Sequence, residues 1–176
     1  MGGQTCRNEI RLKFEGIQAE CHLAGAYLTG KGQSHEVVTL VDHAMPDNVS
    51  RQNYQGVLGA GAHTAFQGKV IVRPDAQRTN ADQSNHNLLL DRSADANSKP
   101  ELEIYADDVK CSHGATVGEL DPNMMFYLQT RGLDEITARN MLVEAFIAQL
   151  VDDIPAGAIQ DLVRHVAGRW LTRVKD

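Results

Sequence analysis

The stretch from Gly118 to Met125, Gly-Glu-Leu-Asp-Pro-Asn-Met-Met, separates two parts of the chain with different patterns. Asp121 is a typical helix N-cap and Pro122 suits the first helical position, so a helix is predicted to begin here. Before this point short apolar segments alternate with turn residues, and after it apolar residues recur at helical spacing. We therefore expect a β-rich core over residues 1–120 and a helical domain over residues 121–176.

The β-rich part contains short segments in which apolar and polar residues alternate. The expected strands are Leu12–Phe14, Cys21–Tyr27, Glu36–Val41, Gln55–Leu58, Val70–Val72, Leu88–Leu90 and Leu102–Tyr105. Gly, Asn, Asp and Pro separate them, and Asn80, Asn85 and Asn87 are assigned to turns.

No segment before Asp121 has the length and pattern of a helix that would connect parallel strands. A sandwich, a barrel and a β-solenoid remain as fold classes. Scattered Gly and Asn, together with the absence of Asn-Gly and Asp-Gly hairpin turns, favour the solenoid, although no strict repeat period is visible.

Three helices are expected after Asp121. The first ends at Gly132, the second runs from about Asp134 to just before Pro155, and the third begins near Gly157 and continues to the C-terminus. The last helix carries an apolar stripe with near-ideal helical spacing. Packing within the helical domain is the favoured interpretation of this stripe. Docking of another protein, with Trp170 as anchor, is the alternative.

Composition excludes several classes of protein. The 176 residues carry a net charge of −6, which disfavours binding to nucleic acid. Three cysteines are too few for a disulfide framework and fit a reducing compartment. No segment has the roughly 20 apolar residues of a membrane helix or the apolar core of a signal peptide, so a cytoplasmic protein without membrane attachment is expected.

Two local patterns resemble functional motifs but favour simple turns. Gly25–Lys31 fits the first seven positions of a phosphate-binding loop, yet Gly32 occupies the place of the magnesium-binding Ser or Thr. We expect this chain to bind no nucleotide. Asp107 and Asp108 are adjacent, so on a strand they would point to opposite faces, and a turn is the preferred interpretation. No nucleophile elbow or zinc-binding motif marks a catalytic centre.

The spacing Cys111-x-His113 is the strongest candidate for chemistry. On a strand, residues two apart face the same side, with their backbones about 6–7 Å apart. Thiolate and imidazole are both good iron ligands. Spacing alone still favours a structural cysteine, because Cys in a strand usually behaves as a small buried hydrophobe.

A long run around this pair is similar to one family. Residues 100–118, Pro-Glu-Leu-Glu-Ile-Tyr-Ala-Asp-Asp-Val-Lys-Cys-Ser-His-Gly-Ala-Thr-Val-Gly, resemble the SufB/SufD family of iron–sulfur cluster assembly proteins. Phe126–Leu133 extends the resemblance downstream, and Asn85–Leu90 is one of several matching segments upstream. Cys111 and Gly114 place the chain on the SufD branch, because the SufB branch has a Glu-His-Glu-Ala-Thr type sequence here.

The resemblance implies a right-handed parallel β-helix followed by a small C-terminal α-helical domain. It implies a scaffold rather than an enzyme, with a SufB-like sister subunit and a SufC-like ATPase as partners. A homodimer through the β-helix is a further expectation. Members of the family are longer, so the chain would correspond to their C-terminal part.

The resemblance also implies site residues. His113, and second Cys111, match the family positions implicated in handling iron or a nascent cluster at the subunit boundary. The helical domain would dock the ATPase, with Phe126, Phe146 and Trp170 as candidate contacts. Two alternatives stay open: a β-helix carbohydrate-active enzyme, which the 5% aromatic content disfavours, and a purely structural solenoid without a metal role.

Overall fold

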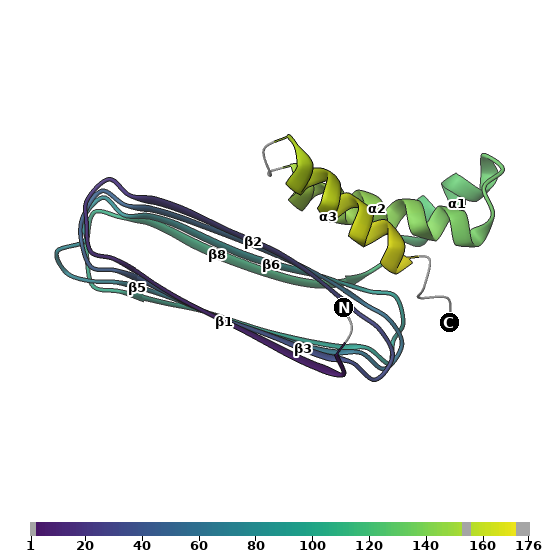
Figure 1. Cartoon of the computed structure of the whole chain (residues 1–176), viewed down its shortest axis with the longest axis horizontal. Helices are drawn as coiled ribbons and strands as arrows, with labels where there is room; N and C mark the ends of the chain where they lie inside the picture. The colour runs from purple at the N-terminus through teal and green to yellow at the C-terminus, as the bar shows by residue number, and fades with distance from the viewer. Residues whose placement is uncertain (1–2, 153–155, 172–176) are drawn as a thin grey trace.

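The computed structural model describes residues 3–152 and 156–171, in which eight strands are followed by three helices. Figure 1 shows the strands as one elongated body with the helices at one end. The strands are β1 Thr5–Phe14, β2 Glu20–Thr29, β3 Ser34–His43, β4 Val49–Leu58, β5 His63–Val72, β6 Asn80–Leu89, β7 Asp95–Ile104 and β8 Lys110–Glu119. The helices are α1 Pro122–Thr130, α2 Glu135–Asp152 and α3 Ala158–Leu171.

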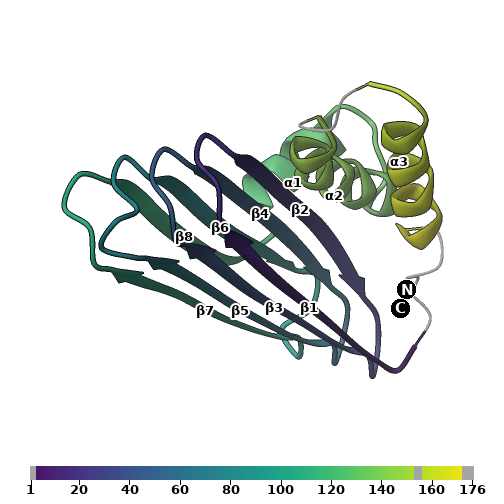
Figure 2. The same cartoon turned by 60° about the vertical axis from the view of Figure 1, so that its left-hand side comes forward.

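Two parallel sheets form the β-rich part. Odd-numbered strands pair in the order β1-β3-β5-β7 and even-numbered strands in the order β2-β4-β6-β8, so each coil contributes one strand to each sheet. Figure 2 shows these two layers with the turns of successive coils stacked at both ends. The predicted parallel β-helix followed by helices is confirmed.

The coils form a structural repeat, although no fixed period is visible in the sequence. Thr5 pairs with Ser34, an offset of 29 residues, whereas His63 pairs with Asp95, an offset of 32. All eight strands span ten residues, so the variation comes from the turns between them. Because turns of different length shift the alignment from coil to coil, a fixed period cannot be detected along the chain.

Each strand alternates between the interior and the outside, as strand geometry requires. On the inward rows, glycines make room for aromatic rings from the neighbouring coil. A Cβ on Gly25 would lie 2.6 Å from the ring of Tyr54, and a Cβ on Gly56 would overlap the ring of Tyr27. Here glycine is required by close packing rather than by a turn.

The assignment of Asn80, Asn85 and Asn87 to turns is wrong, because all three lie in β6. Asn85 and Asn87 are 0% and 3% exposed. The Asn85 amide nitrogen donates to the Tyr27 hydroxyl, and that hydroxyl donates to Asn87 Oδ1, each at 2.7 Å. Asparagine has a low strand propensity, but a buried polar network that satisfies its amide groups overrides that preference.

The turns from the first sheet to the second repeat one backbone feature. Gln18, Asp47 and Arg78 occupy equivalent corners and all have φ near +60°. Arg78 donates two hydrogen bonds to the Asp47 carboxylate, at 2.5 and 2.6 Å. Beside this corner the fully buried Asn48 bonds to backbone atoms of the adjacent coil, including the Ala19 N–H at 2.7 Å. Side-chain pairing therefore holds successive corners in register.

The helix starts and stops follow the predicted caps. Asp121 accepts a hydrogen bond from the Asn123 N–H at 2.8 Å, and Asp134 accepts one from the Thr137 N–H at 2.9 Å. Gly132 ends the first helical segment with φ +91°. Pro155, which marks the predicted end of the second helix, lies outside the described residues. So do residues 172–176, the end of the third predicted helix.

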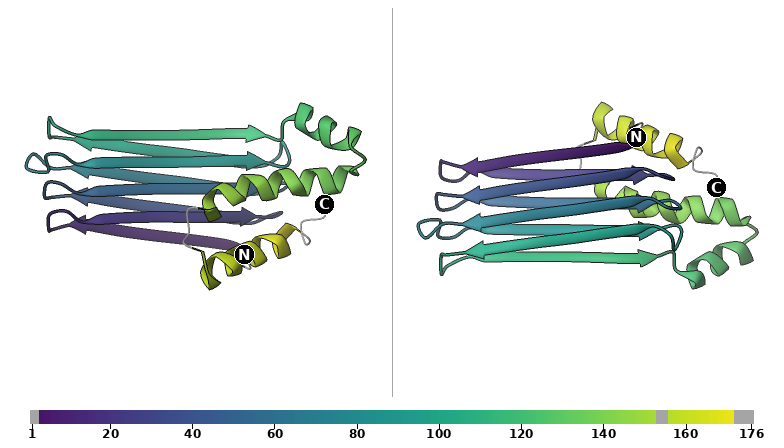
Figure 3. Two further views of the ribbon diagram at one scale, coloured as in Figure 1. Left: turned by 90° about the horizontal axis from the view of Figure 1, so that it is seen from above. Right: turned by 90° about the horizontal axis from the view of Figure 1, so that it is seen from below.

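The second and third helices pack on the outer face of the second sheet. Leu28, Val57 and Leu88, in register on β2, β4 and β6, form one apolar cluster with α2 and α3 that includes Val143 and Trp170. Figure 3 shows α2 and α3 over the sheet and α1 beyond the strand ends. None of the side chains of α1 is buried.

Candidate functional site

The candidate site lies on the last coil of the solenoid. β8 forms one edge of its sheet and β7 forms the corresponding edge of the other. No strand in the described part of the chain covers these edges. The inward side chains of this coil are consequently open: Val117 is 49% exposed and Ile104 is 41% exposed. An open edge of a parallel sheet presents unpaired backbone groups and an apolar interior to a partner.

Cys111 and His113 lie on β8 as the spacing predicted. Cys111 pairs in register with Ala81, and His113 pairs with Gln83. Ala81 and Gln83 are each 1% exposed in the interior, so Cys111 and His113 continue two inward rows. Both side chains therefore belong to one face of the strand, at the end where the interior opens.

The surroundings of the two side chains differ. Cys111 is half-buried and packs against an apolar cluster that includes Val72 and Ala81, and burial raises the pKa of its thiol. His113 is exposed. A neutral thiol releases its proton when a cation binds, because the metal ligand is the thiolate. The pair thus offers an exposed imidazole and a thiol that must lose its proton to bind a metal ion.

The outward face of β8 fixes the strand that carries the pair. The Ser112 hydroxyl donates to the Asp82 carboxylate at 2.5 Å, and His86 Nδ1 lies 2.8 Å from the Thr116 hydroxyl oxygen. These cross-strand contacts join β8 to β6 on the side opposite the candidate ligands. These hydrogen bonds on the outward face of β8 therefore fix the backbone between Cys111 and His113.

Two ligands are all that the described chain brings together here. Across residues 3–152 and 156–171, no three His, Cys, Asp or Glu side chains converge as a metal site. The cysteines Cys6, Cys21 and Cys111 are free thiols. A cluster held by four protein ligands would need further ligands from a second chain.

The structure confirms a turn at the end of Gly25–Lys31 and at Asp107 and Asp108, but most of the first segment lies in a strand. Gly25 to Thr29 belong to β2 and Gly30 to Gln33 form the turn into β3, so no helix N-terminus follows that could receive a phosphate. Asp107 and Asp108 lie in the bend between β7 and β8.

The three candidate partner contacts occupy different environments. Phe126 is 67% exposed on α1, Phe146 is partly buried, and Trp170 is 8% exposed inside the cluster between helices and sheet. Part of the apolar stripe on α3 therefore packs internally. Ile159 and Leu162 of the same helix remain 69% and 60% exposed.

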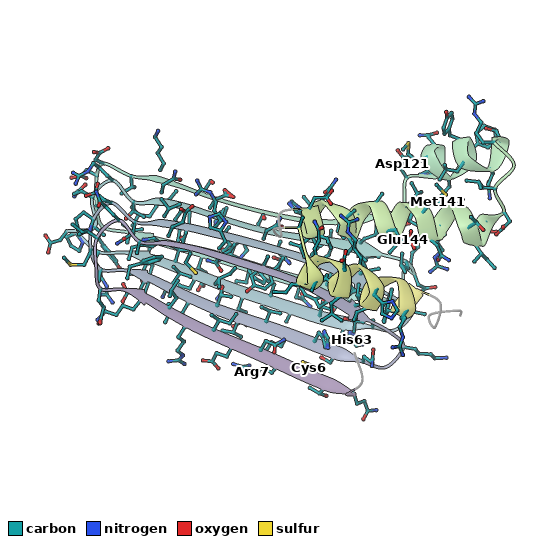
Figure 4. The ribbon with its side chains drawn as sticks, turned by 45° about the horizontal axis from the view of Figure 1, so that its top comes forward. Cys6, Arg7, His63, Asp121, Met141 and Glu144 are labelled. Atoms are coloured by element: carbon teal, nitrogen blue, oxygen red, sulfur yellow. The ribbon has the colours of Figure 1, made fainter. Side chains whose placement is uncertain are left out.

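Sequence analysis missed a groove between α2 and α3. It has a volume of about 460 Å³ and is lined by residues that include Met141, Glu144, Ala148, Arg164 and Gly168. Figure 4 labels Met141 and Glu144 on α2. Small residues on both helices, such as Ala148 and Gly168, were the signal that could have revealed it. No helix within the described ranges has the length and apolarity needed to span a bilayer.

Comparison with known proteins gives a consistent result. The family model for the SufBD core domain of SUF system FeS cluster assembly matches residues 1–146. An iron–sulfur cluster assembly SufBD family protein of Synechocystis sp. is 41% identical over 169 residues, which cover 94% of this chain and 36% of that protein. The iron–sulfur cluster assembly protein SufD of Escherichia coli is 34% identical, with 96% and 40% covered.

A chloroplastic protein of Arabidopsis thaliana, ABCI7, is 35% identical, with 95% of this chain and 36% of that protein covered. The chain thus spans well under half the length of these relatives. The matched region contains every strand of the solenoid and most of the first two helices. This chain belongs to the SufBD core domain family of the SUF iron–sulfur cluster assembly system.

Proposed function

We propose that this chain is a scaffold subunit that helps to assemble and transfer nascent iron–sulfur clusters. The observation that carries the proposal is the position of Cys111 and His113. They sit two residues apart on the edge strand of the solenoid, on the inward face of its open last coil. Iron or a nascent cluster would be cargo at this position rather than a resident cofactor.

The proposed site is shared between two chains. Cys111 and His113 supply two ligands, and a sister subunit docked on β7 and β8 would supply the others. Such docking would cover the exposed interior of the last coil, including Val117 and Ile104. We propose a SufB-like protein as this partner, and a second copy of the chain is the alternative.

The helices are proposed to receive a SufC-like ATPase. The exposed side chain of Phe126 and the groove between α2 and α3 are apolar features that a partner could bury. ATP binding by that partner would act on the subunit boundary through a change in conformation. This chain itself would bind no nucleotide, and we propose that the complex works in the reducing cytoplasm.

The test is reconstitution with SufB-like and SufC-like partners, followed by iron and sulfide analysis. His113→Ala should lose most of the bound iron while the subunits still co-purify, and Cys111→Ser should lose less. The control is Lys110→Ala, a change to an exposed residue at the start of the same strand. If a variant with both Cys111 and His113 replaced kept its iron and sulfide, the chain would have only a structural role. If the chain bound neither the SufB-like nor the SufC-like protein, the proposed complex would be wrong.

A further inference from the structure

Three polar side chains lie buried inside the solenoid without hydrogen-bond partners among the described residues. Gln52 and Gln83 are 2% and 1% exposed, and Thr39 is 1% exposed. For both glutamines the amide nitrogen and the amide oxygen lack a partner in the described part of the chain, as does the Thr39 hydroxyl. We call Thr39, Gln52 and Gln83 the interior amide cluster.

The register brings these groups together. Gln52 and Gln83 are paired residues on β4 and β6, so their side chains start about 4.8 Å apart on one inward row. From β6 the Gln83 amide extends across the interior to Gly68 on β5, where a Cβ atom would overlap it. Gly68 is the register partner of Thr39 on β3. The amide of Gln83 therefore reaches the inward row that contains the Thr39 hydroxyl.

Unpaired groups at this depth are unusual. Leaving a buried donor or acceptor unsatisfied costs about 1–3 kcal/mol, and most buried polar atoms in folded proteins have a partner. The adjacent row shows the usual solution, because Asn85 donates to Tyr27 and Asn87 donates to Asn85. The interior amide cluster contrasts with this row although both include inward side chains of β6.

Direct pairing between the two glutamines cannot satisfy the cluster. Neither amide bonds to the other among the described residues, and even a reciprocal pair, in which each amide nitrogen donates to the other oxygen, would leave one N–H of each glutamine unpaired. The cluster therefore needs a ligand that both donates and accepts. The three side chains are uncharged, which argues against a bare cation or anion.

We propose that the interior amide cluster binds at least one ordered water molecule, which bridges Gln52 and Gln83 and contacts Thr39. Buried waters typically make about three hydrogen bonds to polar groups that are otherwise unsatisfied. The row leads outward to His113, the register partner of Gln83, at the open end of the solenoid. Exchange with bulk water would proceed from that end. This inference does not depend on the proposed function.

The test is water–protein NOE and ROE spectroscopy of the ¹⁵N-labelled chain, observed at the side-chain NH₂ groups. Gln52 and Gln83 should show water cross-peaks whose NOE and ROE have opposite signs, as a long-lived bound water gives. Asn48 is the internal control: it is 0% exposed, and its NH₂ group donates to the carbonyl oxygens of Gly16 and Met45. It should show no such cross-peak.

Proton exchange through the Thr39 hydroxyl could imitate a bound water. The measurement is therefore repeated on Thr39→Val, in which the glutamine cross-peaks should persist. Their loss in this variant would assign them to the hydroxyl and overturn the proposal. Absence of cross-peaks at both glutamines of the unaltered chain would overturn it directly.

Discussion

A buried histidine should make the stability of this solenoid depend on pH. His43 is 0% exposed, and its ring stacks on Phe14 with centroids 4.5 Å apart. Its Nε2 lies 2.9 Å from the Ser50 hydroxyl oxygen, while Nδ1 has no partner among the described residues. Burial lowers the pKa of His43 from 6.5 to about 4, opposed in part by the charge of Asp42.

The direction of the effect follows from proton linkage. Well above pH 6.5 His43 is neutral in both the folded and the unfolded chain, so its contribution to stability is complete. As the pH falls from 6.5 towards 4, the unfolded state takes up a proton that the folded state excludes, and the free energy of unfolding decreases. The total loss is roughly 3 kcal/mol, because each pKa unit corresponds to about 1.36 kcal/mol.

Urea denaturation between pH 7 and pH 4 measures this loss. His43→Phe keeps an aromatic ring against Phe14 but cannot titrate at this position, so it should lose about 3 kcal/mol less than the unaltered chain over this range. The loss that remains comes from other groups, such as His35, whose pKa is also lowered by burial. The control is His22→Phe, since the His22 side chain is 64% exposed and its replacement should retain the slope of the unaltered chain. Equal losses in the unaltered chain and in His43→Phe would refute the reasoning, as would an NMR titration of His43 near pH 6.5.

Three further changes test the packing and the helix caps. Gly56→Ala should destabilise the fold by about 3 kcal/mol through overlap with a buried ring, whereas Gly118→Ala meets no atom within 4 Å and should be close to neutral in chemical denaturation. Trp170→Ala should lower the free energy of unfolding by about 3–5 kcal/mol and release α3 from the sheet. Phe126→Ala should change it by less than about 0.5 kcal/mol, because that side chain is exposed. Equal losses in chemical denaturation would contradict the burial described above. Asp134→Ala should cost about 1 kcal/mol and speed amide exchange in the first turn of α2, and unchanged exchange would mean that the cap contributes nothing.

The sequence by itself determined the features that depend on near neighbours. Asp121 and Pro122 start α1, and Gly132 ends the segment, because capping is a contact between residues a few positions apart. The spacing of Cys111 and His113 likewise predicted two side chains on one face of a strand, and their register with Ala81 and Gln83 agrees. The long run around this pair also indicated the family.

Only the tertiary structure decided the features that depend on residues far apart in the sequence. Asn85 and Asn87 look like turn residues until Tyr27, almost two coils earlier, completes their hydrogen bonds. The apolar stripe of the last helix predicted packing within the helical domain, and only the structure shows that Trp170 also packs against Leu28, Val57 and Leu88 of the sheet. Alternation along a strand shows which residues face inward. Turns of unequal length determine which of these inward residues become neighbours in adjacent coils. This pairing forms both the interior amide cluster and the rows that end at Cys111 and His113.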